Sequence, residues 1–140
     1  MGAWSEDNFG NDDAGDWIWE LEKSKGLRTL LAPIQSVLSE EEYLESLVCS
    51  EALAASEIIA AAVTGDESSI PNEAKAWLNK KQGIIFGKRP QIASGHAKQA
   101  LEAVKKILSS SELQELWEED GENEVWRTVQ NTLIAKLANA

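Results

Sequence analysis

Residues 51–64 read EALAASEIIAAAVT, and this stretch decides the fold. On a helical wheel it is apolar or small on nearly every side, which is typical of a helix enclosed by other elements. After Glu51 the only charged residue in it is Glu57. Gly65 and Asp66 follow directly and end the helix. The stretch therefore predicts a central helix that carries one carboxyl group into the interior.

Further helices are predicted on both sides of this stretch, because apolar residues recur there at helical spacing. These patterns lie at Ala14–Leu21, Leu27–Leu38, Leu44–Leu47, Ala74–Leu78, Ala93–Leu108, Leu113–Trp117 and Trp126–Leu137. Strand patterns are nearly absent, so we expect an all-α fold, a compact bundle of about six or seven helices. The 140 residues suit a single domain, 1–140. Residues 1–11 are predicted to form an extended arm, and 82–95, with three Gly and one Pro, to form a loop.

Helix boundaries are predicted from capping residues. Ser39 with Glu42, and Ser109 with Glu112, have the spacing of a capping box, so a helix is expected to begin after each serine. Asn11 or Asp12 is expected to cap the helix that contains Trp17. Pro33 removes a backbone donor, so the helix around it is expected to begin near Ala32 or to be kinked.

The charge of the chain is strongly negative, with a net value of −11. Residues 1–74 hold 16 acidic and 3 basic residues, whereas 75–106 hold 8 basic residues and 1 acidic residue. Nucleic acids and anionic membranes attract positive surfaces, so we expect neither as the main partner. A basic protein partner fits the charge better. The basic stretch either packs beside acidic helices or binds an anion such as nucleic acid, and the total charge favours the first alternative.

The cellular location is predicted from what the sequence does not contain. Cys49 is the only cysteine, so no internal disulfide can form. The N-terminus has neither a basic region nor an apolar run, and no 18 consecutive apolar residues occur. We therefore expect a cytoplasmic protein without a membrane-spanning segment.

Three stretches resemble a known family. Trp4, Phe9, the run Asn11–Ala14 and Asp16-Trp17 are similar to the start of small bacterial proteins catalogued as domain of unknown function 4259. Ala52–Glu57 resembles the Ala-rich segment of that family, and Ser111–Leu113 with Leu116–Glu118 resembles its Ser-Glu-Leu and Leu-Trp segment. Ser5 departs from it, since the family usually has Gly there. The resemblance implies a helical cytosolic protein and implies no activity, cofactor or catalytic residue.

Metal and cofactor sites are not expected. Asp12, Asp16 and Glu20 are spaced i, i+4, i+8 and could attract a divalent cation, but carboxylates stacked on one helix do not enclose an ion. Their position in the first turns suits the positive end of the helix dipole. The run Gly83–Lys88 is one residue too short for a phosphate-binding loop, and Arg89 stands where Ser or Thr should follow.

Glu57 has two possible roles. A buried carboxylate needs a partner, and a structural Glu57 would be held by Arg28, Arg127, a Trp N–H or backbone amides. A functional Glu57 would act as a general acid or base in a cleft. The structural role is favoured, because no catalytic partner is visible in the sequence. Cys49 and His96 could form a dyad, but no nucleophile motif surrounds them.

Trp4 and Trp19 lie off the apolar stripes. Either the N-terminal arm covers Trp19, or both Trp side chains are free to contact a partner, as Trp often does in interfaces. The candidate binding residues are therefore Trp4, Asp12, Asp16, Trp19 and Glu57. The predicted function is a non-enzymatic protein-interaction module, for example one that neutralises a basic partner protein. The alternative is a small hydrolase or ligand-binding protein that uses Glu57 in a cleft, with Asp12 or Asp16 nearby.

Overall fold

The computed structural model describes residues 5–79 and 92–139, and within these residues it contains seven helices and no strand. The helices are α1 (Asp12–Glu22), α2 (Arg28–Ser39), α3 (Ser46–Thr64), α4 (Asn72–Asn79), α5 (Ser94–Ser109), α6 (Glu112–Trp117) and α7 (Glu124–Ala138). The predicted all-α bundle of about six or seven helices is confirmed.

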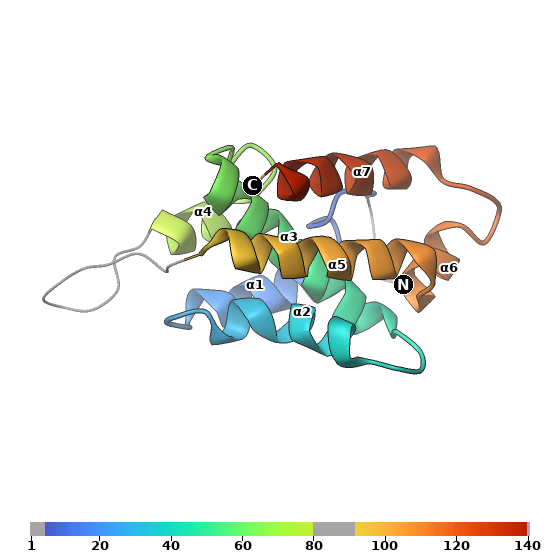
Figure 1. The fold of residues 1–140 in the computed structure, drawn as a ribbon, viewed down its shortest axis with the longest axis horizontal. Helices are drawn as coiled ribbons and strands as arrows, with labels where there is room; N and C mark the ends of the chain where they lie inside the picture. Colours follow the sequence, from blue (N-terminus) through green and yellow to red (C-terminus); the bar gives the residue numbers. More distant parts are fainter. Residues whose placement is uncertain (1–4, 80–91, 140) are drawn as a thin grey trace, which may run out of the picture.

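Helix α3 is the centre of the bundle, and it contacts each of the other six helices. In Figure 1, α5 crosses in front of it, α7 lies above, and α1 and α2 lie below. Small alanines on several of its sides let these neighbours approach closely, as at Ala54 and Ala55, which are fully buried. By length and composition α3 could also cross a membrane, but here most of it is enclosed by the other helices. It is the central buried helix that the sequence predicts.

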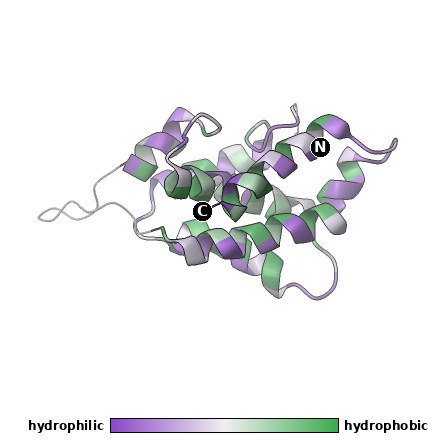
Figure 2. Cartoon of the chain, turned by 45° about the horizontal axis from the view of Figure 1, so that its top comes forward, coloured by the Kyte–Doolittle hydropathy of each residue, from purple (hydrophilic) through white to green (hydrophobic). Residues whose placement is uncertain are grey.

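The core is built from the predicted apolar faces. Figure 2 shows hydrophobic residues mainly on the inward sides of the helices and hydrophilic ones on the outward sides. Trp17, Trp77 and Trp126 are buried, and the indole N–H of Trp77 donates to the carbonyl of Ser24 at 3.3 Å. These large rings join α1, α4 and α7 to the core, since an aromatic side chain buries much apolar area.

The first predicted capping box is wrong. Ser39 is the last residue of α2, and its hydroxyl donates to the Ser36 carbonyl. Helix α3 begins only at Ser46, whose backbone N–H donates to Oε1 of Glu112 at 2.7 Å. The cap comes from α6, far along the chain, so local spacing could not reveal it.

Two other boundaries differ from the prediction. The cap of α6 is Ser111 rather than Ser109, because the Ser111 hydroxyl accepts from the backbone N–H of Gln114 at 3.0 Å. Helix α2 begins at Arg28, ahead of Pro33, which lies inside the helix and is buried. A proline removes one helical hydrogen bond, and here its ring adds buried apolar surface.

The N-terminal segment is more compact than an extended arm. Residues 5–10 form a turn, in which the Ser5 N–H donates to the Gly10 carbonyl at 3.3 Å and the Gly10 N–H donates to the Asp7 carbonyl at 3.4 Å. Most of the predicted loop 82–95 lies outside the described residues, and its last two residues belong to α5. The turn brings residue 8 beside α3 and α7, where the candidate site lies.

Candidate functional site

Glu57 lies inside the bundle on α3, where its side chain is only 7% exposed. Its Oε2 accepts a hydrogen bond from the side-chain amide of Asn8 at 2.9 Å. The same amide group donates to Oε1 of Gln130 at 3.0 Å, and Gln130 donates back to Oδ1 of Asn8 at 2.7 Å. This three-residue network joins the N-terminal turn, α3 and α7.

The turn at residues 5–10 holds Asn8 in this network. The Phe9 N–H donates to Oδ1 of Asp7 at 2.9 Å, which closes the turn on the side of Asp7. Gly10 lets the side chain of Ser5 pack closely, because a Cβ built at position 10 would lie 1.8 Å from Oγ of Ser5 and the hydroxyl would have to move. A small residue at position 10 thus keeps the turn tight, and the amide of Asn8 points inward to Glu57.

Glu57 also reaches an open cleft with a volume of about 590 Å³. We call it the Glu57 cleft. Its lining comes from the N-terminal turn, from α3, from the segment before α4 and from α7. The lining residues are Asp7, Phe9, Glu57, Ser68, Ser69, Ile70, Pro71, Thr128, Val129, Thr132, Leu133 and Lys136. This volume is in the range of small-molecule sites, and the mixture of apolar walls with a few polar groups is typical of them.

Glu57 lines this cleft, and we infer that its second carboxyl oxygen faces it. Oε2 is the oxygen bound by Asn8, and Oε1 accepts no hydrogen bond from the residues that the structure describes. Within the same residues, every fully buried side-chain nitrogen or oxygen has a partner. Oε1 is therefore not fully enclosed, and the cleft is the open space that Glu57 lines.

Burial raises the pKa of Glu57 to about 7. The hydrogen bond from Asn8 and the charge of Lys136 oppose this rise, whereas the charge of Asp7 adds to it. Loss of hydration disfavours the charged form of a carboxyl group, and here it outweighs the attraction of the two favourable neighbours. Near neutral pH the carboxyl group is thus present in both protonation states.

Lys136 lines the cleft, and its ammonium group already contacts two neighbouring residues. Its ammonium donates to Oγ of Ser69 at 2.8 Å and lies 3.6 Å from Oδ2 of Asp66. Ser68 binds the same aspartate, with its hydroxyl 2.6 Å from Oδ1. These contacts attach the segment before α4 to α7 and form one wall of the cleft.

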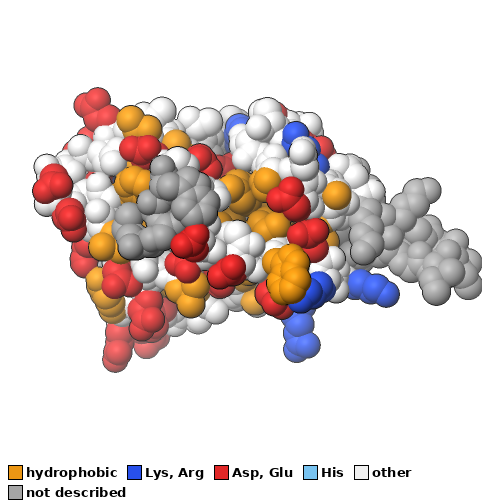
Figure 3. Space-filling view, turned by 180° about the vertical axis from the view of Figure 1, so that it is seen from behind, with side chains coloured by type: hydrophobic (Ala, Val, Ile, Leu, Met, Phe, Trp, Pro, Cys, Tyr) orange, Lys and Arg blue, Asp and Glu red, His pale blue; other side chains and the backbone are white. Residues whose placement is uncertain are grey.

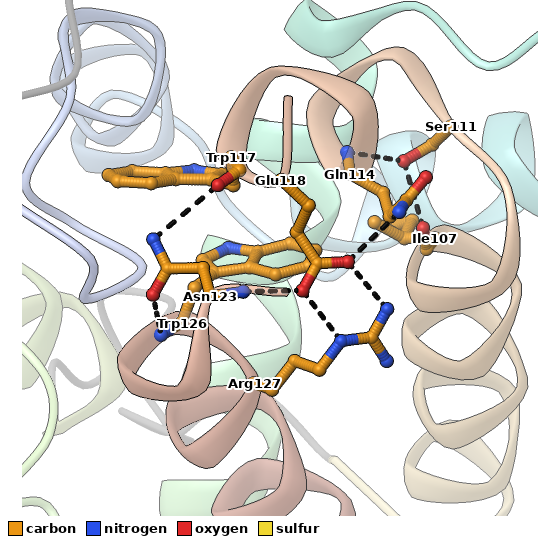
Figure 4. Close-up of polar contacts among 8 residues, drawn as sticks. All are labelled: Ile107, Ser111, Gln114, Trp117, Glu118, Asn123, Trp126 and Arg127. Carbon is orange, nitrogen blue, oxygen red and sulfur yellow. Dashed lines mark hydrogen bonds and ion pairs between the residues drawn. The ribbon is translucent and has the colours of Figure 1, made fainter. Parts of the chain in front are cut away.

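The predicted arginine partners of Glu57 are wrong. Arg127 instead binds Glu118, with Nη2 2.6 Å from Oε1 and Nε 2.7 Å from Oε2 (Figure 4). The same carboxylate accepts from Gln114 and from the backbone N–H of Asn123, both at 2.9 Å. The hydrogen bonds from Arg127 lower the pKa of Glu118 to about 2. Arg28 lies exposed at the start of α2.

The other predicted site residues do not meet in the Glu57 cleft. Asp12 and Asp16 are exposed on α1 and do not line it. Trp19 is 62% exposed, with the ammonium of Lys23 3.6 Å from its ring centre, so the described part of the N-terminal segment does not cover it. Trp4 lies outside the described residues. In residues 5–79 and 92–139, no group of three His, Cys, Asp or Glu could hold a metal ion.

Cys49 and His96 have structural positions. Burial raises the pKa of the Cys49 thiol to about 11, so it is a poor nucleophile. His96 accepts the backbone N–H of Ala93 through Nδ1 at 3.0 Å, at the start of α5.

Lys106 of the basic stretch donates to the Val37 carbonyl at 2.7 Å, where a positive charge suits the C-terminal end of α2.

Asn8 and Gln130 are the site residues that sequence reasoning missed. Gln130 had a usable signal, because it stands between Trp126 and Leu133 on the inward face of α7 and is fully buried. A polar residue on such a face indicates a buried hydrogen bond. Asn8 had none, since it lies in a segment without periodicity.

One face of the molecule is largely acidic. On the face shown in Figure 3, Asp and Glu side chains are widespread and lie among exposed hydrophobic ones, while the Lys and Arg side chains in view lie toward one end. The exposed hydrophobic residues of the described chain include Trp19, Tyr43 and Leu47.

Comparisons with known proteins place the chain in a family without an assigned activity. No curated protein and no solved structure matches it. One family model matches residues 2–129, which is most of the chain. The protein belongs to the family described as Domain of unknown function (DUF4259).

Proposed function

We propose that this protein binds a small molecule in the Glu57 cleft. The observation that carries the proposal is the accessible Oε1 of a carboxyl group that is otherwise buried. A carboxyl group without its full set of hydrogen bonds costs stability, so its retention at the base of a cleft favours a ligand that completes the set. The cytoplasm is the proposed setting.

Ligand binding is favoured over hydrolysis by the groups near Glu57. Ser69 and Lys136 form a hydrogen-bonded pair in the cleft, which is the arrangement of a serine nucleophile with a lysine base. The ammonium of Lys136, however, also lies 3.6 Å from Asp66. Lys136 donates to Ser69 as an ammonium, and an ammonium has no lone pair with which to accept the serine proton.

The proposal is tested by a fragment screen observed by two-dimensional NMR. We expect fragments to shift the amide signals of residues around the cleft, such as Phe9, Ile70 and Thr132, in the unaltered chain. Glu57→Gln should abolish or strongly weaken the binding. Glu20→Gln removes one exposed carboxylate outside the cleft and should leave it unchanged. If no fragment shifts these signals, the proposal is wrong.

A second candidate is an interaction module for a basic protein. It is favoured by residues 40–47, EEEYLESL, where Tyr43 and Leu47 are 48% and 52% exposed beside exposed glutamates. Tyr43 is held by Glu115 of α6, with its hydroxyl 2.6 Å from Oε1. Aromatic and aliphatic side chains surrounded by one sign of charge are suited to a partner of opposite charge.

This second candidate is tested by affinity capture at low and moderate salt. A double charge reversal, Glu41→Lys with Glu42→Lys, should abolish capture of a specific basic protein. The matched control is Glu20→Lys with Glu22→Lys, which makes the same change of net charge on exposed positions of α1. Equal capture by both variants would exclude a role for residues 40–47.

A further inference from the structure

The groups that the Glu57 cleft can offer to a ligand are mainly acceptors. Oε1 of Glu57 is accessible, and the charge of Asp7 lies close enough to affect Glu57. The positive charge in the lining, Lys136, is already bound to Ser69 and Asp66. Asp7 is also bound, by Ser5 and by the backbone N–H of Phe9, so among the charged groups of the described lining Glu57 offers the oxygen without a hydrogen-bond partner.

The remaining walls suit an apolar body. Phe9, Ile70, Pro71 and Leu133 contribute aromatic and aliphatic surface to the cleft. An aromatic ring close to a carboxylate is a favourable environment for an organic cation, because the ring face attracts positive charge. The hydroxyl groups of Thr128 and Thr132 add two weaker hydrogen-bonding partners.

The net charge of the whole protein also favours a cationic ligand. With a net charge of −11, the molecule raises the local concentration of cations and repels anions. An anionic ligand would approach against this field and would then meet the carboxylates of Glu57 and Asp7.

We propose that the ligand is a small organic cation, a primary ammonium group on an apolar body, whose ammonium donates to Oε1 of Glu57. The inference rests on the proposed binding function of the same cleft and names the ligand class. The ammonium completes the hydrogen bonds of a carboxylate that the described residues leave with one unpaired oxygen, and the apolar body covers Phe9 and Ile70.

Binding of such a cation is coupled to a proton. The charged groups that face Glu57 are Asp7 from the N-terminal turn and Lys136 from α7, and burial raises the pKa of Glu57 to about 7. A cation binds the ionised carboxylate, so it must displace the proton when the pH is lower. Its apparent affinity should therefore rise about tenfold from pH 6 to pH 8.

The test uses three probes of nearly the same shape: benzylamine, benzyl alcohol and benzoate. Each is titrated into the full chain at pH 8 and pH 6 and followed by amide chemical shifts. Benzylamine stays protonated at both values. We expect it to bind at least tenfold more tightly than the other two at pH 8, and to lose most of this advantage at pH 6. Glu57→Gln should remove the preference, and Glu20→Gln should retain it.

Other results would contradict the cation class, the binding function or the role of Glu57. If benzyl alcohol or benzoate shifts the cleft signals as strongly as benzylamine, the cation class is wrong while the binding function stands. If none of the three shifts them, and a wider fragment panel also fails, both proposals are wrong. Should Glu57→Gln not fold, the pH comparison in the unaltered chain decides, because an amine preference that is equal at pH 6 and pH 8 contradicts the role of Glu57.

Discussion

Glu57 is hydrogen-bonded inside the bundle and also lines the cleft. One oxygen is bound inside by Asn8, and the other reaches the cleft. The cost of burying this group is visible in its pKa, which burial raises to about 7. A protein that needed only an anchor could place an apolar side chain there at lower cost, since buried polar groups stabilise less than well-packed apolar ones.

Glu57→Gln should therefore stabilise the protein at high pH. The ordinary pKa of the group is 4.5, and the folded value is about 7. Between these values the unfolded chain loses its proton while the folded protein keeps it, so the unaltered protein loses stability as the pH rises. From pH 5 to pH 8 the advantage of the variant in free energy of unfolding should grow by about 2 to 3 kcal/mol.

Urea denaturation of both proteins at the two pH values measures this advantage. Glu20→Gln is the control for the loss of one negative charge. A Glu57→Gln variant that is less stable at pH 8 by as much as at pH 5 would contradict the raised pKa.

At the scale of single elements, caps decide where the helices begin. Ser111→Ala should destabilise the protein by about 1 kcal/mol, because the hydroxyl of Ser111 accepts the Gln114 N–H at the start of α6. The matched control is Ser109→Ala, at the position that the sequence pattern favours. Ser109 is exposed and donates only to a carbonyl of its own helix, so its removal should change stability very little. Thermal unfolding of the two variants compares them directly.

The connection between α6 and α7 depends on Glu118. Its carboxylate accepts from Arg127, Gln114 and Asn123, so Glu118→Gln should cost about 1 to 2 kcal/mol. Arg127 is half-buried, so solvent screening limits the effect. The pKa of Glu118 is lowered to about 2 from 4.5, so this stabilisation is complete above pH 4.5 and is lost as the pH falls toward 2.

Glu119→Gln, one residue further along and exposed, is the matched control. Chemical denaturation at pH 7 and pH 3 should show a penalty for Glu118→Gln that shrinks at the lower pH. A penalty that is equal for the two glutamate variants would contradict a specific role for the Glu118 contacts.

The periodicity of apolar residues predicts which segments form helices, but it does not predict the residues at which those helices begin. The apolar faces containing Trp17, Val104 and Leu133 predict α1, α5 and α7, because burial of one helix face leaves a regular pattern in the sequence. The start of α3 depends on Glu112, 66 residues away, and the partner of Glu57 is Asn8, 49 residues away. Such contacts exist only after the chain has folded, so no local pattern contains them. The buried Glu57 was predictable, and the cleft beside it was not.

At the scale of the whole molecule, self-repulsion opposes the compact state. A net charge of −11 on 140 residues is high, and the described residues hold only two ion pairs, Arg127–Glu118 and Lys136–Asp66. Salt screens repulsion between surface charges, with a screening length of about 10 Å at 0.1 M. The melting temperature should therefore rise when sodium chloride is increased from low concentration to about 0.3 M. A fall would mean that screened ion pairs contribute more than the repulsion does.

The bond between Ser46 and Glu112 has a consequence for how the protein opens. Besides this contact, the backbone N–H of Glu112 donates to the Leu44 carbonyl at 2.9 Å, so the start of α3 and the start of α6 protect each other. Movement of either helix end away from the other breaks both hydrogen bonds. In native-state hydrogen exchange the amides of Ser46 and Glu112 should therefore exchange together, with one shared opening free energy. The two segments then behave as one cooperative unit, although 66 residues separate them in the sequence.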